Sequence, residues 1–269
     1  MKDKARIISA IVMISIVTVL YNFFPQGLPY LVVAVGLGVS YEFFQNFLKV
    51  EFNAKSILSY GLFLSVVLFG KNFISEDQII HILWASSLLN VLLLVYLFKS
   101  AMDSLSFLNS LKKFFILPII YFSLVTLSLV YLLQSDDWKE LLTILLLVTY
   151  GMDTGAWFFG KNFGKTKLWK TVSPNKTVEG FFGGMFSSSI LGSLGLYIFN
   201  GKVDLLLALV FGLCGGISQL GDLLESKLKR QAKIKDSSNL IPGHGGFYDR
   251  VDSLFFLGPF FLLLMRYLK

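Results

Sequence analysis

The sequence predicts an all-α, polytopic membrane protein with about nine transmembrane helices, and its composition is the first reason. Hydrophobic residues make up 55% of the 269-residue chain, charged residues only 15%, and the mean hydropathy is +0.68. Soluble domains are about 45–50% apolar and about 25% charged, so a larger soluble core does not explain these values. The apolar runs are continuous rather than alternating, which favours helices as the spanning elements.

The individual spans follow from a window of ~20 mostly apolar residues. They are expected at about 7–24, 28–48, 56–74, 79–98, 114–133, 141–160, 178–199, 203–225 and 251–268. The sequence contains no internal repeat and leaves no room for a separate soluble domain. We therefore expect one integral membrane domain over residues 1–269, with N-terminal helices at about 1–133 and C-terminal helices and loops at about 141–269.

The basic residues predict the orientation of the spans. The chain carries 24 Lys and Arg residues against 17 Asp and Glu, a net charge of +7. Most of these basic residues fall at the N-terminus and in the loops on its side of the membrane, above all 161–177 and 226–250. Cytoplasmic loops carry such an excess, so we expect the N-terminus in the cytoplasm and the C-terminus outside. The same rule explains the positive charge without a nucleic-acid partner.

Acidic residues at the ends of the last two spans are the first candidates for chemistry. Asp222 and Glu225 are spaced i, i+3 and share a helix face, as do Asp249 and Asp252 if the last span begins there. Charges near a bilayer are costly, which favours pairing, cavity lining or ion binding. Carboxylates gathered in this way suit Mg²⁺. The alternative is a set of ordinary helix-end acids in water, with Arg250 as a local ion partner.

The two long loops carry groups that bind phosphate. They are Lys227, Lys229, Arg230, Lys233 and Lys235 in one loop, and Ser173, Asn175, Lys176 and Thr177 in the other. Arg gives bidentate contacts to phosphate and Lys gives a point charge. His244 lies among Gly243, Gly245 and Gly246, where backbone amides can approach a phosphate closely. Positive-inside bias explains the charge of these loops but not the interleaved Ser, Asn, Gly and His.

Three other sequence features say less about function. Residues 160–166, GKNFGKT, are one residue short of a Walker A phosphate loop and follow a membrane helix rather than a strand, so we reject that motif. Glu42 and Asp153 lie within expected spans, where an acid pairs or lines a cavity, and the sequence assigns them no further role.

Residues 226–252, SKLKRQAKIKDSSNLIPGHGGFYDRVD, resemble the signature of the phosphatidate cytidylyltransferases, also called CDP-diacylglycerol synthases. The positions in register are Ser226, Lys229, Arg230, Lys235, Asp236, Pro242, His244, Gly245, Gly246, Asp249, Arg250 and Asp252. A second segment, SPNKTVEG at 173–180, is similar to the Ser-Pro-Lys-Lys-Thr-x-Glu-Gly of that family, with Asn175 in place of a lysine. The resemblance covers the C-terminal half in detail, and the N-terminal half only through its hydrophobic layout.

The resemblance implies a multi-span enzyme of the cell (inner) membrane, often a homodimer, with its active site on the cytoplasmic side. Its substrates are CTP and phosphatidate, and its products are CDP-diacylglycerol and pyrophosphate. It implies Mg²⁺ held by Asp222, Asp249 and Asp252, with a second cation beside it, and His244 in phosphate contact or proton transfer to pyrophosphate. The implied substrate-binding residues are Ser173, Lys176, Lys229, Arg230, Lys235 and Arg250.

Two other functions stay open at this point. A CTP-dependent kinase of a polyprenol or phytol also joins CTP to a membrane lipid, but the complete His-Gly-Gly and Asp-Arg-x-Asp pattern argues against it. An ion-coupled transporter would use intramembrane acids, yet transporters usually show repeated halves, and the acids here gather near one membrane face.

Overall fold

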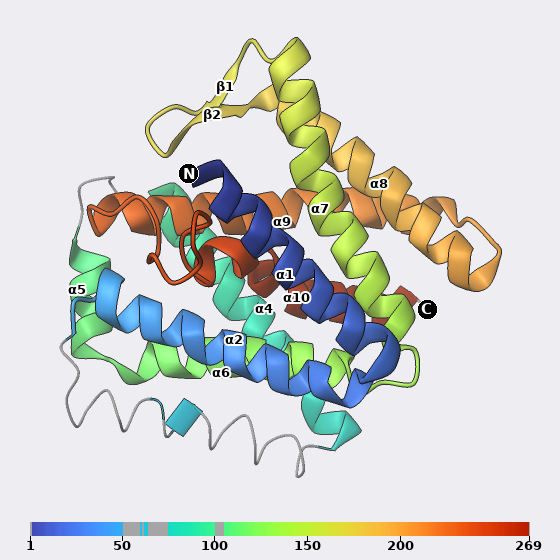
Figure 1. Ribbon diagram of the computed structural model, residues 1–269, viewed down its shortest axis with the longest axis horizontal. Coiled ribbons are helices and arrows are strands. Elements are labelled where there is room, and N and C mark those ends of the chain that lie inside the picture. The colour runs from blue at the N-terminus through green and yellow to red at the C-terminus, as the bar shows by residue number, and fades with distance from the viewer. Residues whose placement is uncertain (1, 51–59, 61, 64–74, 100–104, 269) are drawn as a thin grey trace. The chain divides into compact units, whose positions relative to one another are not determined.

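The computed structural model describes residues 2–50, 60, 62–63, 75–99 and 105–268, and these are overwhelmingly helical (Figure 1). Seven of the described helices are long and apolar enough to cross a membrane, or eight if one bent pair counts as a span. The prediction of an all-α polytopic membrane protein is thereby confirmed in its main feature. Of the expected spans, the one at 56–74 lies almost wholly outside the described residues.

The helices follow the expected order along the chain. They are α1 (Lys2–Phe23), α2 (Leu28–Glu42), α4 (Glu76–Lys99), α5 (Ser106–Lys113), α6 (Ile116–Leu132), α7 (Trp138–Phe163), α8 (Val178–Asn200), α9 (Leu205–Gln231) and α10 (Tyr248–Leu268). A 3₁₀ turn, η1 (Pro25–Gly27), precedes α2, and a π-helical turn, η2 (Phe43–Phe47), follows it. Helices α5 and α6 meet at a bend of 89°, so the expected span at 114–133 is α6 with a short helix turned away from it.

The chain forms two compact units, and each is built from separate stretches of sequence. Unit 1 comprises Met1–Ser86, Asp103–Gln134 and Leu228–Val251. Unit 2 comprises Ser87–Met102, Ser135–Lys227 and Asp252–Lys269. The boundary falls within α9 and within α10, so each of these two helices contributes residues to both units.

The core of unit 1 is a set of aromatic side chains around α2, η2 and α6. The ring of Phe122 lies edge-on to Phe43 and to Tyr248, with centroids 5.2 and 5.7 Å apart. All three side chains are buried. Edge-to-face aromatic pairs contribute stability beyond that of the apolar area they bury. This cluster therefore fixes the start of α10 against α2 and α6.

Unit 2 is organised by the packing of α7 along α8, where small residues allow the two backbones to approach (Figure 1). A Cβ on Gly184 would lie 2.6 Å from the sulfur of Met152, and 2.8 Å from its carbonyl oxygen. The Ser188 hydroxyl donates to the Val148 carbonyl across the same interface at 2.8 Å. Small residues and hydroxyl hydrogen bonds are the usual means of helix association in lipid, where no hydrophobic force drives it.

A short antiparallel hairpin departs from the all-α expectation. Strands β1 (Lys167–Trp169) and β2 (Ser173–Thr177) pair between α7 and α8, in a segment predicted only as a polar loop. Thr177 then caps α8, since its hydroxyl oxygen accepts from the Gly180 N–H at 3.1 Å. Helix α7 runs to Phe163, so most of the rejected Walker A match lies on a helix end.

Candidate active site

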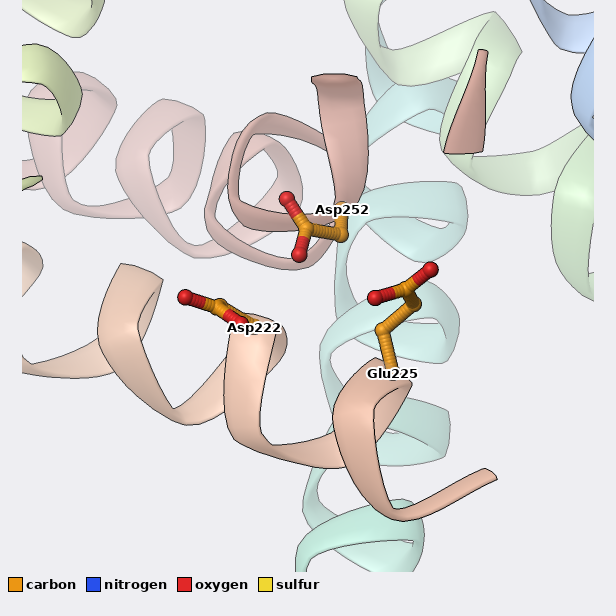
Figure 2. Close-up of side chains that lie close together, drawn as sticks. All are labelled: Asp222, Glu225 and Asp252. Atoms are coloured by element: carbon orange, nitrogen blue, oxygen red, sulfur yellow. The ribbon is translucent and has the colours of Figure 1, made fainter. Parts of the chain in front are cut away.

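Three carboxylates come together in unit 2. Asp222 and Glu225 project from α9 and Asp252 from α10, and Figure 2 shows the three side chains close together. One oxygen from each lies within 4.8 Å of the other two. The i, i+3 spacing places the first two on one helix face, as the sequence predicted.

Gly221 is the residue that lets α10 approach α9 at this point. A Cβ at Gly221 would lie 2.5 Å from the Cβ of Phe256 and 3.2 Å from the Asp252 carbonyl oxygen. Real Cβ atoms do not approach other atoms so closely, so any larger residue would push the helices apart. The glycine therefore sets the distance between Asp252 and the two acids of α9.

Asp222 is also the point where the hairpin meets this cluster. Lys176, on β2, forms an ion pair with the Asp222 Oδ2 at 2.5 Å. Gln219 and Ser226 donate to the same carboxylate at 3.3 and 3.2 Å. Lys176 offers a single positive charge beside three carboxylates. Carboxylate oxygens so close together are the ligands that a hard divalent cation such as Mg²⁺ prefers, so the donor set fits the predicted ion.

Asp249 belongs to a different set of contacts, in unit 1. Its Oδ1 pairs with Lys229 Nζ at 2.7 Å. Its Oδ2 accepts from the Ser237 N–H, the Ser237 hydroxyl and the Gly246 N–H, each at 2.8 Å. The structure thus brings together two of the three predicted metal ligands, Asp222 and Asp252, and adds Glu225. The ligand role of Asp249 stays a prediction.

His244 lies in the glycine-rich loop between α9 and α10, where α1 contacts it. Its Nδ1 is 2.7 Å from the Ser9 hydroxyl, and Arg6 Nε donates to the Gly243 carbonyl at 2.7 Å. Partial burial, followed by the positive charges of Arg250 and Arg6, lowers the pKa of His244 below its usual value. The lowered pKa favours the neutral form of the imidazole.

The remaining predicted substrate-binding residues differ in exposure. Arg230, Lys235 and Arg250 are exposed, while Ser173, on β2, is partly buried, as are Lys176 and Lys229 in their ion pairs. Exposed cations can reach a soluble polyanion without first breaking an internal contact. The substrate-binding role of all six stays a prediction.

Two buried charges have contacts that sequence reasoning did not find. Glu42 is fully buried in unit 1 and accepts hydrogen bonds from the loop that carries His244. Lys227 is fully buried in unit 2, with its ammonium 5.3 and 5.6 Å from the ring centroids of Tyr96 and Trp169. An acid inside an apolar span was the available signal for Glu42, whereas the sequence placed Lys227 among the loop cations that bind phosphate.

These features define a class: a polytopic helical membrane protein with a carboxylate cluster and a basic, glycine-rich loop. The chain belongs to the cytidylyltransferase family, which it matches over residues 4–268. The family predicted from the two sequence segments is thus confirmed.

Several relatives carry the name phosphatidate cytidylyltransferase. One from Staphylococcus aureus (strain COL) is 49% identical over 123 residues, which are 44% of this chain and 46% of the relative. One from Bacillus subtilis (strain 168) is 44% identical over 120 residues, which are 44% and 45% of the two chains. One from Staphylococcus haemolyticus (strain JCSC1435) is 43% identical over 136 residues, or 50% and 52%. The aligned part therefore spans about half the length of each relative.

Proposed function

We propose that this protein transfers a cytidylyl group from CTP to phosphatidate, giving CDP-diacylglycerol and pyrophosphate for phospholipid biosynthesis. The observation that carries the proposal is the cluster of Asp222, Glu225 and Asp252, with Lys176 beside it, in a member of the cytidylyltransferase family. The names of the relatives supply the lipid substrate.

The reaction asks little of a general base. A phosphate oxygen of phosphatidate forms a bond to the α-phosphorus of CTP, and the bond from that phosphorus to the β-phosphate oxygen breaks. The attacking oxygen is already an anion at pH 7, and the electron pair of the broken bond leaves with pyrophosphate. The difficulty is to bring two polyanions together, so positioning and charge neutralisation are what the protein has to supply.

The side chains divide this work. Asp222, Glu225 and Asp252 would hold Mg²⁺, which supplies positive charge and polarises phosphoryl oxygens when bound. Lys176 neutralises part of the carboxylate charge and would contact a phosphate of the substrate. His244 would contact a phosphate, or take up a proton and then transfer it to pyrophosphate. The other predicted phosphate contacts are Ser173, Lys229, Arg230, Lys235 and Arg250.

The setting follows from the substrates. Phosphatidate stays in the bilayer and CTP arrives from the cytoplasm, so we place the site at the cytoplasmic face of the inner membrane. The excess of basic residues in loops 161–177 and 226–250 supports this orientation. A homodimer and a second cation at the carboxylates, both implied by the family resemblance, complete the proposal.

The test uses purified protein in detergent with Mg²⁺ and phosphatidate, and CTP labelled at either the α- or the γ-phosphate. Transfer of the α label, and only that label, into the lipid phase is the expected result. Transfer of the γ label once a polyprenol or phytol is added would identify a lipid kinase instead. If neither label enters lipid, the enzymatic proposal is wrong.

A further inference from the structure

Glu42, the last residue of α2, is a fully buried carboxylate that accepts hydrogen bonds from the loop before α10 and from the first residue of α10. Its Oε1 accepts from the Phe247 N–H at 2.8 Å and from the Ser238 hydroxyl at 2.7 Å. Its Oε2 accepts from the Tyr248 N–H at 2.9 Å and from the Ser237 hydroxyl at 3.0 Å. Burial of a carboxylate is costly unless donors surround it, and here residues 237–248 provide four.

The same loop is held by Asp249 and by Asn46 of η2. The Ser237 hydroxyl lies 2.8 Å from Asp249 Oδ2 as well as 3.0 Å from Glu42, so it can donate to only one of the two carboxylates at a time. Asn46 Nδ2 donates to the Ser237 carbonyl at 2.7 Å. The end of α2 and the turn after it therefore hold the loop through two side chains, Glu42 and Asn46. A π-helical turn such as η2 is often found at functional sites.

The Glu42 carboxylate approaches the backbone of the loop closely at Gly246. A Cβ at Gly246 would fall against the Glu42 carboxylate and the Ser237 hydroxyl, leaving no space for a side chain. The Gly246 N–H at the same time donates to Asp249 at 2.8 Å. Glycine is therefore required here because the Glu42 carboxylate and the Ser237 hydroxyl occupy the space of a side chain.

We propose that Glu42 is a positioning residue, which fixes loop 237–248 so that His244 and Asp249 are presented in a single geometry. The expected effect on turnover rests on the proposed cytidylyl transfer. The anchoring of the loop by Glu42 does not depend on that function. It also gives the N-terminal half of the chain a part in the site, which the two matching sequence segments do not reach.

A neutral amide cannot replace this carboxylate. Each oxygen of Glu42 faces a backbone N–H, so the amide group of Glu42→Gln meets a donor in either orientation. Glu140 provides the matched control, because it is also buried and its Oε1 accepts from Asn200 Nδ2 at 2.8 Å, a bond that a Gln carbonyl can keep. Leu132→Ala, which truncates a buried side chain of α6 outside the loop, controls for loss of stability alone.

The experiment measures two quantities on the full-length protein in detergent. Hydrogen–deuterium exchange of peptides within 236–248 reports the loop, and α-labelled transfer from CTP to phosphatidate reports turnover. In Glu42→Gln we expect loop exchange on the order of tenfold faster and kcat lower by about 10²-fold. The folded fraction of Glu140→Gln and of Leu132→Ala should show the loop exchange rate and the kcat of the wild type. Glu42→Asp, which retains two charged acceptors, should recover more of the rate than Glu42→Gln.

The outcomes separate the two proposals. Faster loop exchange with loss of transfer supports both. Unchanged loop exchange, or full transfer from a loosened loop, overturns the positioning role of Glu42. Faster loop exchange in a protein whose wild type transfers no label overturns the proposed function and supports Glu42 as the anchor of the loop.

Discussion

The replacement of Asp252 by Asn tests the carboxylate cluster as a cation site, because the two possible roles of Asp252 predict opposite results. Asn preserves the shape of the side chain and can still accept the Ser253 N–H, which lies 2.7 Å from Asp252 Oδ1. The substitution removes one negative charge from a group whose oxygens lie within 4.8 Å of one another. Two unit charges at that distance repel by about 3 kcal/mol at an effective dielectric constant of about 20.

That repulsion gives the sign of the effect in protein stripped of divalent cations. Solvent and Lys176 reduce the figure, so the metal-free Asp252→Asn variant should be at least as stable as the wild type. Mg²⁺ at about 100 times its dissociation constant should stabilise the wild type by about 2.7 kcal/mol. It should stabilise the variant much less.

The assay is thermal unfolding of both proteins in detergent, once with a chelator and once across a Mg²⁺ series. As Mg²⁺ is added, we expect the unfolding temperature of the wild type to rise more than that of the variant. The order of the two temperatures should reverse, or the wild type should move further above the variant. If Asp252→Asn lowers the unfolding temperature equally with and without Mg²⁺, Asp252 is a structural residue and the reasoning is refuted.

Three further predictions concern neighbouring residues. Asp249→Ala should abolish transfer of α-labelled CTP and lower the unfolding temperature, since Lys229 and the loop amides lose their acceptor, whereas near-normal transfer would remove Asp249 from the site. Burial and the charges of Arg250 and Arg6 hold the pKa of His244 low, so protonation favours the unfolded chain; stability should fall as pH drops below about 6.5, and His244→Gln should flatten that part of a pH series of unfolding midpoints. Gly221→Ala should force α9 from α10 and abolish the Mg²⁺-dependent rise in unfolding temperature, and a retained rise would show that this close approach does not set the site.

Hydropathy predicted the helices well because bilayer thickness imposes one length on every span. The expected spans at 141–160, 178–199 and 203–225 coincide with α7, α8 and α9, and the C-terminal ends of α7 and α9 extend further into polar sequence. The hairpin at 167–177 was missed because its strands are short and mostly polar, so they show no alternation to detect. The 89° bend between α5 and α6 also escaped, since hydropathy measures length and not direction.

The carboxylate cluster was predicted in part. The i, i+3 rule placed Asp222 with Glu225 on one face of α9, and a helix period needs no tertiary information. Which acid of α10 joins them depends on the point along that helix at which it contacts α9, and Gly221 is the residue that brings Asp252 close. Sequence spacing could not choose between Asp249 and Asp252, because both lie on the same face of α10.

The role of Glu42 was out of reach for a different reason. Its donors lie about two hundred residues away in the chain, as the separations of 195 and 206 residues from Ser237 and Tyr248 show. An intramembrane acid signals that partners exist, but local periodicity does not say which segment supplies them.

The most direct test of the central claim is the fate of α-labelled CTP with phosphatidate and Mg²⁺, for wild-type protein and Asp252→Asn side by side. We predict that label enters the lipid phase with the wild type, that pyrophosphate appears in equal amount, and that the variant transfers almost none. Equal transfer by the two proteins would contradict the assignment of the cluster, and no transfer by the wild type would contradict the proposed activity itself.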